Sequence, residues 1–148
     1  MWAAAGTGWQ GTVSTSEGAS VAARREVGLR VYRRLSSEGS RGLEEMRVEM
    51  GGPLAEAVVD FCLGELWERP YLDLRIRSLI LIGVLSAMGD YRALRAHVKG
   101  AIAHGATEEE IREVFLLTAG YAGFARATGA AEIAEQIFRD RKVSQQDR

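Results

Sequence analysis

The chain has 148 residues, which is the size of one domain with a single modest core. Its 19 basic and 20 acidic side chains give a formal net charge of -1, so it lacks the positive charge that a nucleic-acid-binding protein normally carries. The single cysteine, Cys62, excludes an intrachain disulfide and a CxxC redox site. We therefore expect a cytoplasmic protein that does not bind nucleic acid.

Neither a membrane span nor a signal peptide is expected. The longest apolar run, residues 79–85, is far shorter than the roughly 18 residues that cross a bilayer. Residues 1–19 are rich in small and polar residues and lack a basic segment followed by a long apolar one. We expect them to form a disordered arm. The alternative is that Trp2 and Trp9 anchor the arm on a partner subunit.

The spacing of apolar residues predicts helices from residue 20 onwards. Ser20 is suited to cap a first helix that ends near Gly39. Residues 39–52 lack clear periodicity, and either a loop or a short helix fits them. Pro53 favours the first turn of a second helix, which extends to Trp67.

Three further helices follow, each with a residue suited to cap its N-terminus and a glycine suited to end it. They run from Asp73 to Gly89, from Asp90 to Gly105, and from Thr107, which forms a capping box with Glu110, to Gly123. A last helix is expected over residues 127–139, before a polar tail at residues 140–148. The expected fold is all-α, with about six helices in one domain of residues 20–139.

The helix that follows Asp73 has almost no polar face. Its residues 79–85 are nearly all apolar, so the helix must be covered on every side. A chain of this length has little material for that cover, and contacts with other copies would supply it. We therefore expect a homo-oligomer. The alternative is that this helix is the central one of a monomeric bundle.

The two histidines, His97 and His104, are the candidates for acid–base chemistry. Seven residues of helix separate them, so they share a face but lie roughly 10 Å apart along the axis. No carboxylate or cysteine cluster completes a metal site with them, and no metal is expected. His97 lies on an apolar stripe, where it is either a hydrogen-bonded core residue or a proton donor, and its chemistry suits the second role. His104 either reaches the same pocket or lies on the surface at the end of its helix.

Other kinds of catalysis lack support in the sequence. No G-x-S-x-G elbow is present, and Cys62 lies on an apolar helix stripe, where a structural thiol is expected. Arg69, Arg75 and Arg77 surround the start of the apolar helix. Such arginines are usually solvated or structural, but one beside an apolar pocket can hold a carboxylate through two parallel hydrogen bonds. Glu65 would lie on the same side of the fold, unless it serves as a cap or an ion-pair partner.

Four motifs occur in the order and spacing of one known family. Residues 64–79 read G-E-L-W-E-R-P-Y-L-D-L-R-I-R-S-L. Residues 94–101 add an L-x-x-H-V-x-x-A helix, residues 105–111 a G-A-T-x-x-E-I turn, and residues 121–123 the sequence Y-A-G. Together they resemble the gamma-carboxymuconolactone decarboxylase branch of the carboxymuconolactone decarboxylase family, over about residues 21–138.

The resemblance implies an all-α subunit of the alkyl hydroperoxidase D-like superfamily, built into trimers or hexamers. It also implies a cofactor-free loss of carbon dioxide from a carboxylated butenolide, with the substrate as its own electron sink. His97 would be the general acid or oxyanion partner, Glu65 its relay or orienting group, and Arg77 the carboxylate clamp. The site residues implied are His97 and Glu65 as catalytic residues, with Arg77, Arg75, Trp67, His104, Leu117 and Tyr121 as substrate contacts.

The chain departs from both branches of the superfamily in its expected pocket. The peroxidase branch has a CxxC shortly before the shared histidine, whereas this chain has Asp90 and Ala93, so no thiolate can attack a peroxide. Family decarboxylases typically have Asn-Asn, glutamine and proline where this chain has residues 103–104, Leu117 and Ala125. These changes make the pocket more apolar and favour a less polar carboxylated lactone or keto acid.

Two other functions remain open at this point. The same acid–base residues could serve an isomerase or a cyclase that forms an enolate-like intermediate without releasing carbon dioxide. A catalytically silent oligomer that binds a small molecule is the second alternative.

Overall fold

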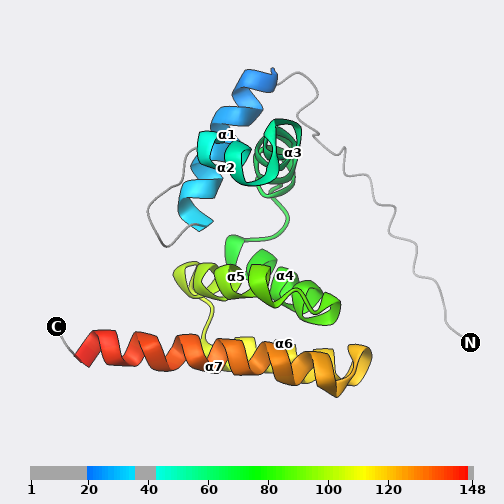
Figure 1. The fold of residues 1–148 in the computed structure, drawn as a ribbon, viewed down its shortest axis with the longest axis vertical. Helices are drawn as coiled ribbons and strands as arrows, with labels where there is room; N and C mark the ends of the chain where they lie inside the picture. Colours follow the sequence, from blue (N-terminus) through cyan, green and yellow to red (C-terminus); the bar gives the residue numbers. More distant parts are fainter. Residues whose placement is uncertain (1–19, 36–42, 147–148) are drawn as a thin grey trace, which may run out of the picture.

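The computed structural model describes residues 20–35 and 43–146, and all of its regular elements are helices. In chain order they are α1 (Val21–Leu35), α2 (Leu43–Met50), α3 (Gly52–Ala57), the π-helix η1 (Val58–Leu66), α4 (Leu74–Met88), α5 (Tyr91–Ala103), α6 (Glu108–Ala122) and α7 (Phe124–Gln146) (Figure 1). The predicted all-α fold is confirmed. No helix within these described ranges is long and apolar enough to cross a membrane. The expected arm at residues 1–19 lies outside the described residues.

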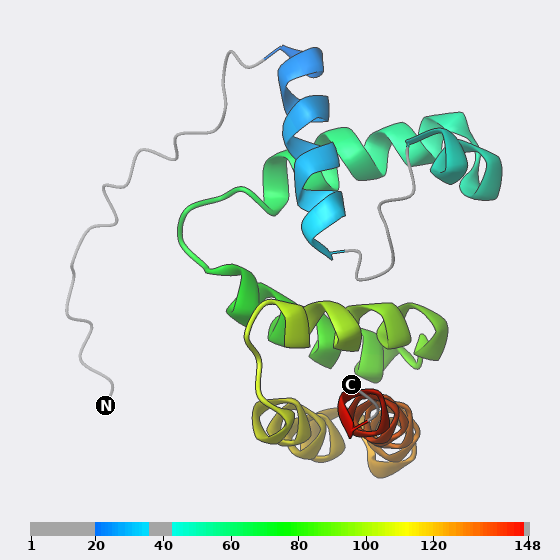
Figure 2. The ribbon, with the colours of Figure 1, turned by 90° about the vertical axis from the view of Figure 1, so that its left-hand side faces the viewer.

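The helices form two lobes, each with its own hydrophobic core (Figures 1 and 2). The N lobe contains α1, α2, α3 and η1, and its core includes Met46 and Val59. The C lobe contains α4 to α7, with α4 and α5 stacked on α6 and α7, and its core includes Ile82 and Phe138. Residues 67–73 link the lobes, and α1 packs against α5 across the junction. The candidate site lies at this junction.

The predicted capping residues set the helix boundaries of the C lobe. Asp73, Asp90 and Thr107 each accept a hydrogen bond from the backbone N–H three residues later. Glu110 completes the capping box of α6 by accepting a hydrogen bond from the Thr107 N–H. Gly89 ends α4 with a φ of 75°, a left-handed conformation that favours glycine.

The segment predicted as one helix up to Trp67 is divided into α3 and η1. η1 is a π-helix, and the last of its wide turns closes with the Trp67 N–H donating to the Cys62 carbonyl at 3.1 Å. α1 crosses η1 at close range because Gly28 and Gly64 have no side chains. A Cβ atom on Gly28 would collide with the carbonyl of Val59, and one on Gly64 with the carbonyl of Arg24.

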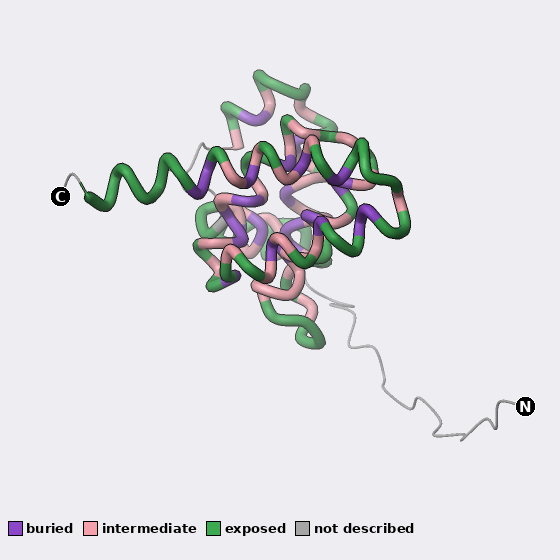
Figure 3. The backbone as a smooth tube through the Cα atoms, turned by 90° about the horizontal axis from the view of Figure 1, so that it is seen from below, coloured by how far each residue is buried: buried purple, intermediate pink, exposed green. Residues whose placement is uncertain are grey.

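Two further boundaries differ from the prediction. A short helix, α2, occupies Leu43–Met50 within the segment that lacks periodicity. α7 begins at Phe124 and continues to Gln146, so most of the expected polar tail is helical. Its end projects beyond the rest of the C lobe and is exposed (Figure 3). Lys142 in this end donates to Glu108 at 3.0 Å, which ties it to the start of α6.

Candidate functional site

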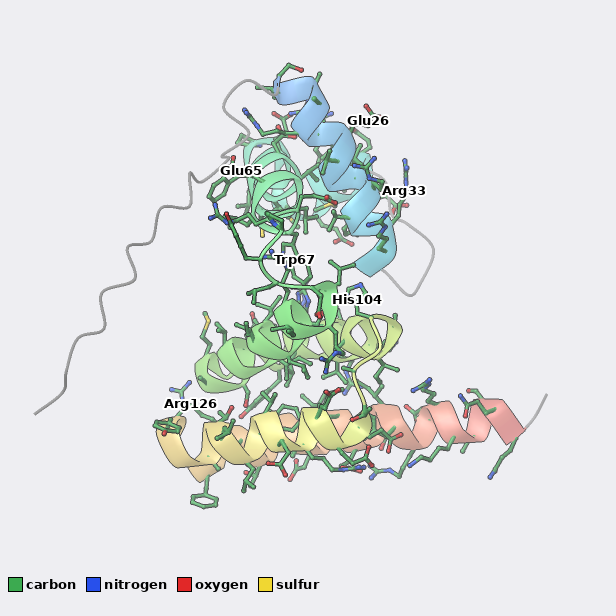
Figure 4. All side chains as sticks on the ribbon, turned by 180° about the vertical axis from the view of Figure 1, so that it is seen from behind. Glu26, Arg33, Glu65, Trp67, His104 and Arg126 are labelled. Carbon is green, nitrogen blue, oxygen red and sulfur yellow. The ribbon has the colours of Figure 1, made fainter. Side chains whose placement is uncertain are left out.

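Two aromatic rings meet where the lobes join. Trp67 ends η1, and His104 follows the last residue of α5. Their ring centroids are 6.4 Å apart, with the planes inclined at 54°. The contact between Trp67 and His104, both predicted site residues, therefore joins the end of η1 to the end of α5 (Figure 4).

His104 is held by a serine of α4. Its Nδ1 lies 2.8 Å from Ser78 Oγ, and Ser78 Oγ lies 2.8 Å from the carbonyl oxygen of Leu74. Because a carbonyl only accepts and a hydroxyl has one proton, Ser78 donates to Leu74 and accepts from the Nδ1–H. The Nε2 atom is buried and forms no hydrogen bond with a described residue. Sequence analysis missed Ser78, whose signal was a polar residue within the R-S-L motif.

The surroundings of His104 favour its neutral form. Burial is the main effect, and it lowers the pKa of the ring. The main-chain carbonyl of Arg34 faces the ring and partly offsets this decrease, without a hydrogen bond of regular geometry to Nε2. Repulsion from the Arg34 guanidinium lowers the pKa further.

His97, the predicted catalytic histidine, is half-buried on α5. Its ring forms no hydrogen bond with any residue in the described ranges. Burial lowers the pKa of His97, the carboxylate of Asp90 opposes that decrease, and His104 adds to it. At neutral pH the ring is therefore mostly neutral and can donate one N–H. Sequence analysis treated Asp90 as a helix cap and missed its position beside His97.

Arg77, the predicted carboxylate clamp, is bound to main-chain carbonyls. Its Nη1 donates to Leu66 at 2.8 Å, its Nε to Leu72 at 3.0 Å, and its Nη2 to Arg69. The guanidinium thereby connects the start of α4 to the end of η1 and to the linker. Its main role in this conformation is to hold residues 67–73 in place.

Neither of the other two predicted charged residues forms a hydrogen bond or an ion pair with His97. Arg75 forms an ion pair with Glu110, the residue that also completes the capping box of α6. Glu65 is half-buried on η1 and forms no hydrogen bond or ion pair with a described residue. Figure 4 shows Glu65 within the N lobe, with Trp67 between it and His104. The structure therefore does not join Glu65 and His97 by a hydrogen bond.

Two hollows open on the face of α4, and the remaining predicted contacts are divided between them. The larger, of about 410 Å³, lies between α4 and α6 and is lined by Leu117 and Tyr121. The smaller, of about 200 Å³, is lined by Trp67 and Arg77. Ile80 lines both, so together they form a continuous apolar surface.

Cys62 and the acidic residues add no further chemistry at the junction. Burial raises the pKa of the Cys62 thiol, an effect that a hydrogen bond with Trp67 partly offsets. The thiol is thus a poor source of thiolate. No three histidine, cysteine, aspartate or glutamate side chains are grouped to hold a metal ion within residues 20–35 and 43–146.

Comparison with known proteins shows which family the chain resembles. The profile of the family described as "Carboxymuconolactone decarboxylase family" matches residues 52–136. A 4-carboxymuconolactone decarboxylase of Acinetobacter baylyi is 33% identical over 119 residues, which are 79% of this chain and 88% of that protein. A nitrosuccinic acid decarboxylase of Metarhizium robertsii is 34% identical over 88 residues, or 60% of this chain and 62% of that protein. An uncharacterized 15.0 kDa protein of Paracoccus denitrificans is 30% identical over 83 residues, or 55% and 62% of the two chains.

Proposed function

Because this chain belongs to the carboxymuconolactone decarboxylase family, we propose that it is a cytoplasmic, cofactor-free carboxy-lyase that acts on a small carboxylic acid. The observation that carries the proposal is the match to a named decarboxylase over 79% of the chain. The two named relatives take a carboxylated lactone and a nitro acid. Both substrates have a group that can accept the electron pair of a departing carboxylate. We infer the same substrate class for this chain.

The proposed reaction needs no group beyond the substrate and a proton. The bond between the carboxylate carbon and its neighbour breaks, and carbon dioxide leaves. The bonding pair moves into the conjugated acceptor, so that negative charge develops on an oxygen atom of the lactone, keto or nitro group. A proton from water then adds at carbon and gives the neutral product. The step that the protein must assist is the development of charge on that oxygen.

His97 is the residue that we assign to this step. Its lowered pKa favours a neutral imidazole, which can donate an N–H hydrogen bond to the developing oxyanion. Its half-buried position strengthens such a hydrogen bond relative to one in water. The Asp90 carboxylate nearby stabilises any positive charge that the ring acquires.

The arrangement of the arginines suits loss of a carboxylate. A guanidinium bound to the departing group would stabilise the charged ground state more than the transition state, in which that charge leaves. Arg77 and Arg75 are instead bound to carbonyls and to Glu110. The apolar hollow beside Trp67 destabilises the localised charge of a carboxylate more than the dispersed charge of the transition state.

The direct test is to incubate the purified protein with 4-carboxymuconolactone and, separately, with nitrosuccinic acid, and to measure carbon dioxide release. We expect release from at least one of them and at least a 100-fold loss of kcat in His97→Ala, the effect typical of removing an oxyanion donor. His97→Gln keeps an N–H donor and should retain more activity than His97→Ala. Arg95→Gln, on the exposed side of α5, is the matched control.

Three outcomes would contradict the proposal in different ways. Product without carbon dioxide would favour an isomerase or a cyclase. Binding without turnover, in a folded protein, would favour the silent oligomer. Carbon dioxide release that is unchanged in His97→Ala would support the decarboxylase activity but exclude His97 from its mechanism.

We also propose that the protein is a homo-oligomer, a trimer or a hexamer, in which a second copy covers α4 and α6. The exposed fractions are 52% for Ile80, 63% for Leu117 and 92% for Tyr121. These three side chains line one apolar hollow rather than being scattered. A helix as apolar as α4 is normally covered on all sides, and within one copy it is not.

A further inference from the structure

The lobe junction contains a half-buried histidine, His104, whose Nε2 atom is fully buried and which the proposed chemistry does not use. The N lobe and the C lobe have separate cores, and they are joined by the linker, by the α1–α5 contact, by the hydrogen bond of Arg77 with Leu66 and by the contact of Trp67 with His104. His104 lies at the end of the α1–α5 contact. A change in its charge therefore acts where the two lobes meet.

His104 is held from both lobes. From the C lobe, Ser78 on α4 accepts its Nδ1–H at 2.8 Å. From the N lobe, Trp67 packs against its ring, and the main chain of Arg34 at the end of α1 faces it. The ring thus joins the ends of α1 and η1 to α4 and α5.

The site favours the neutral form of the ring over the charged form. Its Nε2 is buried and forms no hydrogen bond of regular geometry with a described residue, so a proton added there would place a charge away from water, with the Arg34 main-chain carbonyl as its acceptor. Of the neighbouring charged and titratable groups, Arg34 on α1 and His97 on α5 are basic, while α4 and η1 contribute the neutral Ser78 and Trp67. No carboxylate is among the groups that raise the pKa of His104. The Arg34 carbonyl is the one acceptor that favours a charged ring, and burial outweighs it.

We propose that His104 controls the lobe junction in response to pH. The neutral ring holds Trp67 against α5, and the protonated ring releases it. Protonation makes the enclosed position costly, and the ring moves out to water and takes the Trp67 contact with it. Trp67 and Leu72 of the linker also line the 200 Å³ hollow, so acid removes part of the wall of that hollow. This response to pH is independent of the decarboxylation chemistry and does not require it.

Trp67 provides the readout. Trp2 and Trp9 are replaced by Phe in the full chain, so that Trp67 is the only tryptophan. Its emission is followed from pH 8 to pH 5, with far-ultraviolet circular dichroism recorded in parallel. We expect the emission maximum to shift to longer wavelength as Trp67 becomes hydrated, with a midpoint below the ordinary histidine value of about 6.5. The helical signal should stay constant, because both cores remain intact.

Matched variants at the two histidines identify the titrating group. His104→Gln should abolish the shift and keep the emission near its position at pH 8, whereas His97→Gln should retain the shift. A shift of equal size in His104→Gln, or no shift in the parent, would overturn the proposal. So would a shift that coincides with loss of helical signal, since that is unfolding. If His104→Gln does not fold, the two imidazoles of the parent protein are titrated by NMR instead. An emission shift of Trp67 whose midpoint equals the titration midpoint of His97, and not that of His104, would refute the assignment.

Discussion

The role of Arg77 depends on carbonyls that only the fold brings to it. Its hydrogen bonds with Leu66, Arg69 and Leu72 join α4 to the end of η1 and to the linker. Arg77 uses three separate nitrogens, whereas a lysine has its three donors on one nitrogen and cannot reach three carbonyls spaced around a planar fork. We expect Arg77→Lys to lower the free energy of unfolding by about 2 kcal/mol, measured by denaturant titration.

The control for that variant is Arg95→Lys. Arg95 is exposed on α5 and has no hydrogen bond or ion pair with a described residue, so its change should stay within about 0.5 kcal/mol. An Arg77→Lys protein of unchanged stability, with KM for the carboxylated substrate raised, would instead support the clamp that the sequence suggested.

The proposed role of His97 predicts how kcat/KM depends on pH. Because burial lowers its pKa below about 6.5, the neutral ring is the main form above that pH and is lost as pH falls through the folded-state pKa. If the neutral N–H stabilises the oxyanion, kcat/KM rises with pH and levels off above about 6.5. A pH–rate profile between pH 5 and pH 8 measures this. A rate that falls as pH increases through the same range would assign proton donation by the charged ring instead.

At the scale of helices, the close crossing of α1 and η1 depends on two glycines. A Cβ atom at Gly64 would collide with the Arg24 carbonyl, and backbone cannot move aside as a flexible side chain can. We expect Gly64→Ala to destabilise the protein by about 2 kcal/mol, although alanine is the better helix former. Thermal unfolding followed by circular dichroism measures the change.

Gly120 on α6 is the matched control for Gly64. A Cβ atom there would meet nothing within 4 Å. Gly120→Ala should therefore stabilise the protein by roughly 0.5–1 kcal/mol through helix propensity alone. Equal effects of the two substitutions would contradict the close crossing.

Local chemistry explains why some elements were predictable. Asp73, Asp90 and Thr107 cap their helices through contacts within three residues, and the sequence displays such contacts directly. The wide turns of η1 arise where α1 crosses it, a contact between segments far apart in the chain, so no local pattern indicates them. α7 continues to Gln146 partly because Lys142 reaches Glu108, which is another distant contact.

The candidate site also has some features that the sequence predicts and others that depend on distant contacts. The motif containing His97 placed this residue on a helix, which the structure confirms, and the catalytic role of His97 stays a prediction. The pairing of Ser78 with His104 joins residues 26 positions apart, and the attachment of Arg77 to three carbonyls depends on the conformation of the linker. Residue types therefore suggested a chemistry that remains to be tested, whereas the hydrogen-bond partners of each side chain required the three-dimensional structure.

For the whole molecule, the apolar face of α4 and α6 predicts assembly. Ile80→Glu and Tyr121→Glu each place a charge in the proposed contact and should reduce the mass measured by light scattering toward that of one 16.2 kDa chain. Val48→Glu is the control, because Val48 on α2 is 82% exposed and lies outside this face. A parent protein that already has the mass of one chain would refute the oligomer.

The separate cores also determine how the chain responds to heat. Met46 and Val59 are buried in one core, and Ile82 and Phe138 in the other, so neither group loses its neighbours when the other melts. We therefore expect a calorimetric scan to show two transitions rather than one cooperative transition. The N lobe, which has the smaller core, should unfold at the lower temperature, while the bundle of α4 to α7 remains folded.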